Sequence, residues 1–283
     1  MSIAVLTPSF QYGRFIGDAL DSVEGQTGVD VQHVVQDGGS TDETLDILRR
    51  RTTVDWQSAP DSGQSDALNR ALLRADCDWI TWLNADEYYL PGALRALVAH
   101  ATSSGADVVY GDSVFVDAKG RFLRLLPQHA FSSTVLRTYG AFIASCAVVF
   151  RRSLLGSDPW AIDLTRVMDW DLYLRLSAAG AHFSHLAYPC GAFRVHDGCV
   201  TAAPPATHAH EYAAVGERHR LGLGWRRKAG HLLHSAMKAR EGAYRRQASV
   251  RCLQGCDLRW MASSEGAENC SRLLALGYGR NGE

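Results

Sequence analysis

The sequence predicts an α/β fold in which helices flank a mostly parallel sheet, followed by a helical C-terminal extension. Short apolar segments and helically periodic segments alternate repeatedly over residues 2–112. This alternation is typical of right-handed β-α-β units, which place strands parallel and helices on both faces of the sheet. From about residue 208 the chain is rich in Arg, His, Leu and Ala and shows no strand pattern, so we expect helices there.

The composition is that of an ordinary globular protein. Of 283 residues, 46% are hydrophobic and 21% are charged, and the formal net charge is -1. One large domain, or one domain with a small appendage, is expected, and binding of a polyanion by the whole chain is not. Seven scattered cysteines indicate reduced thiols rather than a disulfide framework. The N-terminus lacks a signal-peptide pattern and residues 140–150 are too short to span a bilayer, which favours a cytoplasmic protein.

The N-terminal half supplies the clearest elements, because apolar runs predict strands and a period near 3.6 predicts helices. The expected strands cover 3–10, 31–39, 55–60, 78–86 and 106–112. The expected helices cover 14–26, 41–51, 63–75 and 91–105. Pro91 and Gly105 are the usual helix start and stop residues.

The second half is less regular. Residues 120–142 resemble a hairpin followed by a loop, and 143–155 a strand followed by the start of a helix. A helix is expected over 168–181 and a strand over 189–198, ending in His196 and Asp197. A linker at 202–211 and helices over about 208–260 complete the expectation.

Polar residues follow three of the expected strands. They are Thr7-Pro8-Ser9, Asp37-Gly38-Gly39 and Asn84-Ala85-Asp86. In open α/β sheets, ligands bind beyond the carboxyl ends of the strands. Asp37 on its glycine-rich turn can accept a hydrogen bond from an imide or a ribose hydroxyl, while the glycines let a flat ligand approach. The alternative is a simple helix start capped by Ser40 or Thr41.

Asp86, followed by Glu87, is suited to a hard divalent cation. Mg²⁺ or Mn²⁺ takes a few carboxylate oxygens together with phosphate oxygens of a substrate, and offsets the charge of a leaving diphosphate. The alternative is a solvated acidic loop before the next helix.

Two further pairs carry possible chemistry. Asp169 at a helix mouth can take a proton from a hydroxyl, or cap the helix, a role that suits Asp171 better. Arg194 and His196 alternate on an expected strand and so face the same side, where they can bind phosphate or a metal. The alternative is a buried strand with one satisfied histidine.

In this order, the motifs resemble family 2 glycosyltransferases with the GT-A fold, over residues 2–200. The matching segments are VLTPSFQYGRFIGDALDSVEGQT, VVQDGGSTDETLDIL, DSGQSDALNRAL, ITWLNADEYYLPGAL, YGD, MDWDLYLRLSAAG and FRVH. Each motif is modest, but the ordered set is specific.

The resemblance implies a role for each matching residue. Thr7, Pro8 and Tyr12 correspond to a nucleotide-contacting loop, Asp37 to the residue that holds the base, and Asp66 to one near the nucleoside and sugar. Asn84-Ala85-Asp86 occupies the position of the DxD motif, with Asp86 as the metal ligand. Asp169 corresponds to the catalytic base and His196 to a metal or diphosphate contact, while Arg194 is expected to bind the donor because Arg can pair with phosphate. Asn84, Glu87 and Met168 depart from the usual residues of the family.

The resemblance further implies sugar transfer with inversion from a nucleoside diphosphate sugar, most often a UDP-sugar, using Mn²⁺ or Mg²⁺. The acceptor class stays open between carbohydrate, lipid-linked and small molecules, and no nucleic acid is expected.

The catalytic domain would cover 1–204, with a nucleotide-binding half at 1–112 and an acceptor-side half at 113–204. The C-terminal extension would cover 205–283. Alternatives are nucleotidyl transfer on the same fold, for which TPSFQYGRF lacks a basic glycine-rich loop, and a non-catalytic binding module.

The C-terminal extension is basic. From Glu217 to the end, thirteen Lys and Arg stand against six Asp and Glu. Either this extension packs on the domain or forms a homodimer contact, or an amphipathic helix touches the inner face of a membrane.

Overall fold

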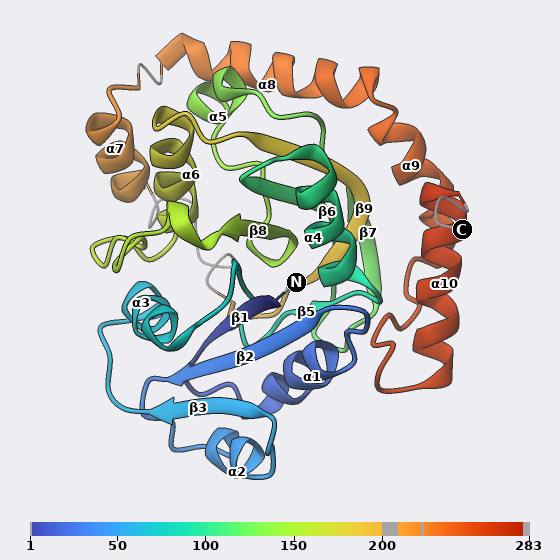
Figure 1. The fold of residues 1–283 in the computed structure, drawn as a ribbon. Coiled ribbons are helices and arrows are strands. Elements are labelled where there is room, and N and C mark those ends of the chain that lie inside the picture. The colour runs from blue at the N-terminus through green and yellow to red at the C-terminus, as the bar shows by residue number, and fades with distance from the viewer. Residues whose placement is uncertain (1, 200–208, 222–223, 280–283) are drawn as a thin grey trace.

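The computed structural model describes residues 2–199, 209–221 and 224–279 (Figure 1). The strands are β1 (Ser2–Ser9), β2 (Asp30–Asp37), β3 (Val54–Ser58), β4 (Trp79–Trp82), β5 (Tyr88–Tyr89), β6 (Val108–Val116), β7 (Phe122–Leu126), β8 (Val148–Arg151) and β9 (Phe183–Arg194). The α-helices are α1 (Gly13–Glu24), α2 (Thr44–Arg49), α3 (Gln64–Arg74), α4 (Ala93–Ser104), α5 (Ser133–Thr138), α6 (Met168–Ala178), α7 (Ala209–Arg218), α8 (Gly224–Arg240), α9 (Ala243–Ser249) and α10 (Ser264–Tyr278). All helices and strands expected over residues 2–112 are present.

Within the described residues, the strands form one nine-stranded sheet. Its order is β3-β2-β1-β4-β8-β6-β9-β5, and β7 pairs with β6. The first four strands in this order are parallel, as are β6 and β9. The pairings of β8, β7 and β5 are antiparallel. The α/β class with flanking helices is confirmed.

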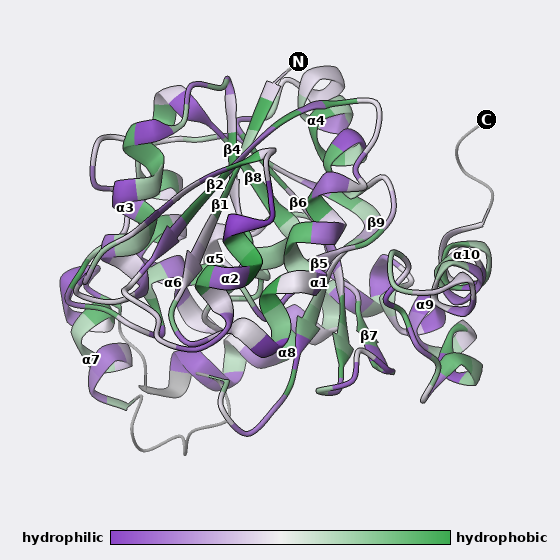
Figure 2. Ribbon diagram, turned by 90° about the horizontal axis from the view of Figure 1, so that it is seen from below, coloured by the Kyte–Doolittle hydropathy of each residue, from purple (hydrophilic) through white to green (hydrophobic). Residues whose placement is uncertain are grey.

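The apolar core lies on both faces of this sheet. In β1, Ala4 and Leu6 join the cluster beneath α3 and α6, whereas Ile3 and Val5 join the cluster beneath α4. A strand buried on both faces has no polar alternation, which is why β1 reads as a continuous apolar run. Figure 2 shows these apolar strands in the interior, with hydrophilic residues gathered on the outer helices and loops.

The loop after β2 depends on its glycines. Gly39 has a φ of +90°, a conformation that residues with a side chain rarely adopt. A Cβ on Gly38 would lie 3.0 Å from a carboxylate oxygen of Asp61. The two glycines therefore let the loops after β2 and β3 approach one another closely.

Two elements differ from the sequence expectation. The segment expected as hairpin and loop contains β7, as expected, but also α5, whose start is capped by the Ser132 hydroxyl. The strand expected over 189–198 begins earlier, at Phe183, and ends at Arg194. Register shifts in its pairing with β6 interrupt the alternation that would have marked its first half. Consequently His196 and Asp197 lie just beyond the strand rather than on it.

The C-terminal extension packs against the sheet. Leu253, Leu258 and Leu273 form one apolar cluster with Val114 and Phe122 of β6 and β7. The helical part reaches past residue 260, because α10 follows. Most of the expected linker lies outside the described residues.

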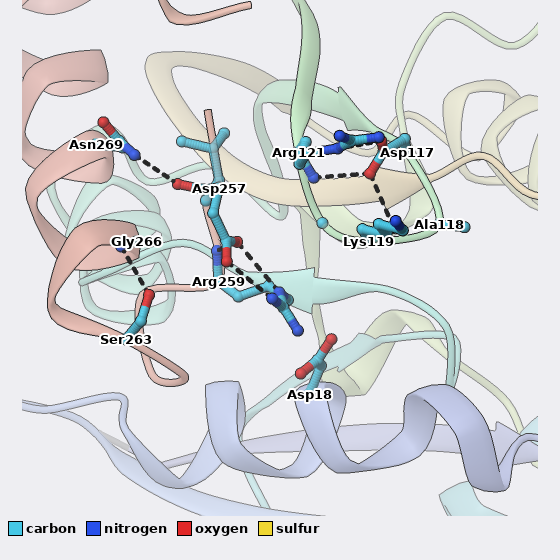
Figure 3. A network of polar contacts seen from close by, with 12 residues as sticks. Asp18, Asp117, Ala118, Lys119, Arg121, Asp257, Arg259, Ser263, Gly266 and Asn269 are labelled. Atoms are coloured by element: carbon cyan, nitrogen blue, oxygen red, sulfur yellow. Dashed lines mark hydrogen bonds and ion pairs between the residues drawn. The ribbon is translucent and has the colours of Figure 1, made fainter. Parts of the chain in front are cut away.

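Polar contacts fasten the segment before α10 (Figure 3). Asp257 binds Arg259 through both carboxylate oxygens, and the Asn269 side-chain amide donates to the Asp257 carbonyl. The Ser263 hydroxyl accepts from Gly266 N–H at the start of α10. Arg259 lies next to Asp18 of α1. The extension thus contacts the first helix of the chain as well as the sheet.

The expected division at 112/113 falls inside β6, and strands from both sides of it belong to one sheet. Among the helices of the described chain, none combines the length and hydropathy needed to cross a membrane.

Candidate active site

A cavity of about 470 Å³ lies beyond the carboxyl ends of β1 and β4 and beside the start of α6. Loops that follow β1, β2, β3 and β4 contribute to its wall. Its lining includes Pro8, Ser9, Phe10, Tyr12, Gly38, Asp61, Gly63, Gln64, Ala67, Trp82, Asn84, Ala85, Asp86, Glu87, Ser145, Thr165, Arg166, Met168, Asp169, Phe193 and Cys199. This is the position at which α/β sheets bind ligands.

Six of the residues singled out in the sequence line this cavity. They are Pro8, Tyr12, Asn84, Ala85, Asp86 and Asp169. The other five, Thr7, Asp37, Asp66, Arg194 and His196, are absent from the lining, but His196 contacts the lining residue Asp86.

Asp86 and His196 form a pair at the cavity. The His196 Nε2 lies 3.0 Å from the Asp86 Oδ2, and the rings of Tyr12 and Phe15 pack against the imidazole. Asn84 is also fixed, because its Oδ1 accepts a hydrogen bond of 2.6 Å from the Gln64 amide. Within the described part of the chain, no group of three or more His, Cys, Asp or Glu side chains gathers as a metal site.

Glu87 lies behind this pair. Its side chain is buried, one carboxyl oxygen accepts from Asn84 N–H, and the other has no hydrogen-bond partner among the described residues. Burial and the neighbouring charge of Asp86 raise the pKa of Glu87 well above its ordinary value.

Asp169 stands on the first turn of α6 and lines the cavity. Its Oδ1 accepts a hydrogen bond from the Trp170 N–H. Burial raises the pKa of the Asp169 carboxyl to about 6, against the lowering effect of that hydrogen bond. Neither acid of this turn caps the helix, since α6 has no side-chain cap. Asp171 instead binds Arg175, Arg218 and His219 on the other side of the helix.

Asp37 is fully buried at the end of β2 and organises the loop that follows. Its carboxylate accepts hydrogen bonds from Gly39 N–H, from the Ser40 N–H and hydroxyl, and from the Ser58 hydroxyl. The neighbouring Gly38, rather than Asp37, forms cavity wall. In this structure the carboxylate therefore fixes the shape of the wall.

Three other candidates support the site from outside the cavity. The Thr7 hydroxyl is buried against His33 at 2.9 Å. Asp66 forms a two-point ion pair with Arg70 and accepts a hydrogen bond from Ser62 N–H in the turn before α3. Arg194 is buried, donating to the carbonyl of Asp86 and pairing with Asp18. It therefore holds the backbone of the acidic motif.

Sequence reasoning missed other cavity residues. Asp61 lies on the wall, and burial raises the pKa of its carboxyl. Only the second acid of the segment DSGQSD was singled out, although Asp61 comes first after a strand. Trp82 was also missed, and its buried indole Nε1 has no partner among the described residues; the same holds for the hydroxyl of Ser9, which the sequence did place after the first strand. The sequence gives no sign that a strand residue such as Trp82 lines the cavity with a buried indole N–H that lacks a partner among the described residues.

Helix α7 of the extension holds the loop before Asp169 through hydrogen bonds. The carboxylate of Glu211, on α7, accepts hydrogen bonds from the Thr165 hydroxyl, Thr165 N–H and Arg166 N–H. Burial acts in the opposite direction, yet these hydrogen bonds lower the pKa of Glu211. Thr165 and Arg166 both line the cavity, so the extension shapes the site.

Comparison with known proteins identifies the family. Residues 4–156, more than half of the chain, match the family model described as glycosyl transferase family 2. The chain is a member of glycosyltransferase family 2. A PGL/p-HBAD biosynthesis glycosyltransferase of Mycobacterium bovis is 30% identical over 192 residues, which cover 61% of this chain and 68% of that protein. Chondroitin synthase of Pasteurella multocida is 27% identical over 197 residues, 66% of this chain but 20% of that protein.

Solved structures confirm the GT-A fold of this glycosyltransferase. S. aureus TarS 1-349, in complex with UDP-GlcNAc, superposes with a TM-score of 0.63 at 15% identity, covering 98% of this chain and 82% of that chain. The chain spans 44% of the length of a longer TarS chain. The mannosyltransferase PcManGT of Pyrobaculum calidifontis, in complex with GDP-Man and Mn²⁺, superposes with a TM-score of 0.55 at 16% identity, covering 99% and 88% of the two chains.

Proposed function

We propose that this glycosyltransferase moves a sugar from a nucleoside diphosphate sugar, a UDP-sugar first, to an acceptor hydroxyl with inversion at the anomeric carbon. One observation carries the proposal. A single cavity brings together the Asp86–His196 pair and the Asp169 carboxyl, whose pKa is about 6. A volume of about 470 Å³ suits a ligand of this size.

The donor would bind along the β1, β2 and β4 loops. Pro8, Phe10 and Tyr12 offer apolar surface for a base, while Gly38 allows close approach of a flat ring. Asp61 on the same wall can accept hydrogen bonds from a base or ribose hydroxyls. The solved complexes of TarS with UDP-GlcNAc and of PcManGT with GDP-Man support a nucleotide-sugar donor.

The residues present fit a divalent cation of the Mg²⁺ or Mn²⁺ kind. Such ions use one or two protein side chains together with substrate phosphate oxygens, and Asp86 and His196 supply a carboxylate and an imidazole at one point. Glu87, one of whose carboxyl oxygens has no hydrogen-bond partner within the described ranges, is a close neighbour of Asp86. When bound, the ion would neutralise the charge of the departing diphosphate. PcManGT was solved with Mn²⁺.

Asp169 is proposed as the general base. It takes the proton of the acceptor hydroxyl while the hydroxyl oxygen forms a bond to the anomeric carbon. The bond from that carbon to the diphosphate oxygen breaks on the opposite face, so the configuration inverts. With a pKa of about 6, the carboxyl is ionised at neutral pH and still basic enough to accept the proton. Correct placement of the two reactants would supply much of the rate.

Family membership favours glycosyl transfer over nucleotidyl transfer and over a purely binding module. The test is calorimetric titration with UDP, with and without Mn²⁺, followed by product detection with a panel of nucleotide sugars. We expect UDP binding strengthened by Mn²⁺, and glycosylated product with one of the donors. Asp86→Ala should abolish the effect of Mn²⁺ on binding, whereas Asp30→Ala, exposed at the other end of β2, should not. Binding indifferent to Mn²⁺ in the unaltered protein would remove the metal from the proposal.

A further inference from the structure

One segment of the C-terminal extension, residues 226–251, is strongly cationic. From residue 226 to 251 the chain carries eight Lys and Arg and a single acid, Glu241. The basic residues are Arg226, Arg227, Lys228, Lys238, Arg240, Arg245, Arg246 and Arg251. The carboxylate of Glu241 is turned inward, where it accepts a hydrogen bond from Ala130 N–H. Most of this charge therefore has no counter-charge in its own segment.

Helix α8 has one face against the molecule and one outside. Gly230 and His234 face α5, and a Cβ on Gly230 would lie 2.5 Å from the Thr138 hydroxyl, so the two helices touch closely. Figure 1 shows α8 along the outer edge of the molecule, with no described element covering it. The outward face is thus available to a partner.

A stripe with a spacing of four residues runs along that outward face. It consists of Lys228, Leu232, Ala236 and Arg240, and all four are exposed. Residues four apart lie above one another on a helix. Leu232 is 74% exposed, the highest value among the large hydrophobic residues of the described chain, and Leu233 beside it is 38% exposed. We call these five residues the α8 ridge.

The cations of the α8 ridge are not engaged elsewhere. Neither Lys228 nor Arg240 forms an ion pair with any described residue. By contrast, Arg246 on the inner side pairs with the buried Asp112. The ridge therefore combines unpaired positive charge with exposed leucine, and α9 continues the surface with exposed Arg245 and Tyr244.

We propose that the α8 ridge docks on the surface of a lipid bilayer that contains anionic headgroups. Lys228 and Arg240 would lie among the headgroups, while Leu232 and Leu233 would enter the boundary with the acyl chains. Each Lys or Arg near such a surface contributes about 1 kcal/mol, or about fivefold in binding. The inference concerns the extension and stands independently of which donor the cavity takes.

Charge argues against a second copy of this chain as the occupant. A two-fold dimer places the same patch against itself. Two α8 ridges face to face would bring Lys and Arg together, because this surface offers no exposed acid to pair with them. Like charges at an interface are unfavourable, whereas an anionic leaflet complements the ridge.

The experiment is co-sedimentation of the full chain with vesicles of phosphatidylcholine, with and without phosphatidylglycerol. We expect binding only to the vesicles with phosphatidylglycerol, and loss of binding as salt is raised. The variant Lys228→Gln/Arg240→Gln should bind about 25-fold more weakly, from about fivefold for each cation. Leu232→Asn should also weaken binding. These positions are on the surface, so folding should be unaffected, which melting curves will check.

Matched controls lie at the other side of the molecule. Arg49→Gln/Arg50→Gln at the C-terminal end of α2 removes two exposed cations, and Leu73→Asn on α3 removes a leucine that is 67% exposed. Both should bind vesicles as the unaltered protein does.

Equal binding to both vesicle types, or equal loss of binding in the control variants and the ridge variants, overturns the proposal. A dimer by light scattering that Leu232→Asn makes monomeric overturns it in favour of self-association. Binding to soluble polyphosphate without binding to vesicles overturns the lipid surface as partner.

Discussion

At the residue scale, Asp169 owes its chemistry to where α6 begins. Burial at the cavity removes water from the carboxylate, and the backbone N–H groups of Trp170 and of Asp169 itself offset this only in part, so the pKa of Asp169 lies at about 6. Asp171, two residues later, shows the contrast. It is buried more deeply but is surrounded by Arg175, Arg218 and His219, whose hydrogen bonds lower its pKa against burial. The same type of side chain is therefore proposed as the base at position 169 and forms a structural anchor at position 171.

We predict that Asp169→Asn lowers kcat by roughly 10²–10⁴-fold, because an amide cannot accept the acceptor proton. Donor binding should be unchanged, which titration with UDP will check. In the unaltered protein, the base must be ionised to act. Its activity should therefore be constant above pH 6 and fall about tenfold per pH unit below it. A rate that stays level down to pH 4 would assign the proton to another group.

Trp82 provides a second prediction at this scale. Its indole Nε1 is buried at the cavity and has no partner among the described residues, while the ring stacks on Phe150. A buried donor without a partner is costly unless a ligand completes it. Trp82→Phe should therefore lower kcat/KM about fivefold, corresponding to a hydrogen bond of about 1 kcal/mol.

Trp160 is the matched control for this prediction. Its Nε1 is also buried and has no partner in the described part of the chain, but the residue does not line the cavity. Trp160→Phe should leave kcat/KM unchanged. Equal losses in the two variants would show that packing, and not a ligand hydrogen bond, explains the effect of Trp82→Phe.

At the element scale, α7 of the extension completes the wall of the cavity. Glu211 binds Thr165 and Arg166, and Arg218 and His219 bind Asp171 of α6. Two contacts therefore join α7 to the loop and to the helix that carry Asp169. This makes the extension part of the site rather than an appendage beside it.

We predict that Glu211→Gln lowers kcat about tenfold, about 1.4 kcal/mol in activation free energy, while KM for the donor changes little. The amide of Gln keeps one acceptor oxygen but loses the negative charge and the second acceptor oxygen. The loop before α6, which contains Thr165 and Arg166, then holds Asp169 less firmly. The measurement is steady-state kinetics at saturating donor. Glu217→Gln on the exposed side of the same helix is the control. A rise in donor KM with constant kcat would place the role of Glu211 in donor binding instead.

Elements were predictable where local sequence decides them. The alternation over residues 2–112 gave strands and helices near their observed positions, because buried parallel strands and amphipathic helices have distinct periods. The helix α5 and the early start of β9 were not predictable. The first is six residues long, and the second depends on pairing with β6, far away in the sequence. Similarly, Asp86 and Asp169 follow recognisable motifs, whereas Trp82 and Glu211 gain their roles only from tertiary contacts.

At the scale of the whole molecule, buried polar groups join the extension to the sheet. Asp112 of β6 is fully buried and accepts hydrogen bonds from Tyr278 of α10 and from Gln128 N–H, beside Arg246 of α9 and His185 of β9. The contacts of Asp112 with Tyr278 and Arg246 link residues more than a hundred positions apart. They explain why the basic composition of the extension could be read from sequence but its attachment could not.

A histidine pair at the other end of the extension makes this attachment sensitive to acid. His234 of α8 lies 2.8 Å from His129, whose Nδ1 faces the Ala130 carbonyl. His129 Nδ1 therefore donates to that carbonyl, and its Nε2 accepts from His234. Burial, the cation Lys238 and the neighbouring His129 and His231 lower the pKa of His234 to about 3. Burial likewise lowers the pKa of His129.

We predict that the protein loses stability as the pH falls below about 6.5. The unfolded chain binds protons at histidine near that pH, whereas the folded state keeps His234 neutral, so each further unit costs up to about 1.4 kcal/mol until the pH nears 3. His234→Asn keeps a donor for His129 but cannot titrate. Its loss of melting temperature between pH 7 and pH 5 should be smaller than that of the unaltered protein. His210→Asn, at an exposed position, is the control. The pKa of the buried His33 is also lowered to about 3, but His33 is unchanged in all three proteins and therefore contributes equally to each. An identical pH dependence in all three would mean that the histidine pair does not govern the attachment of α8.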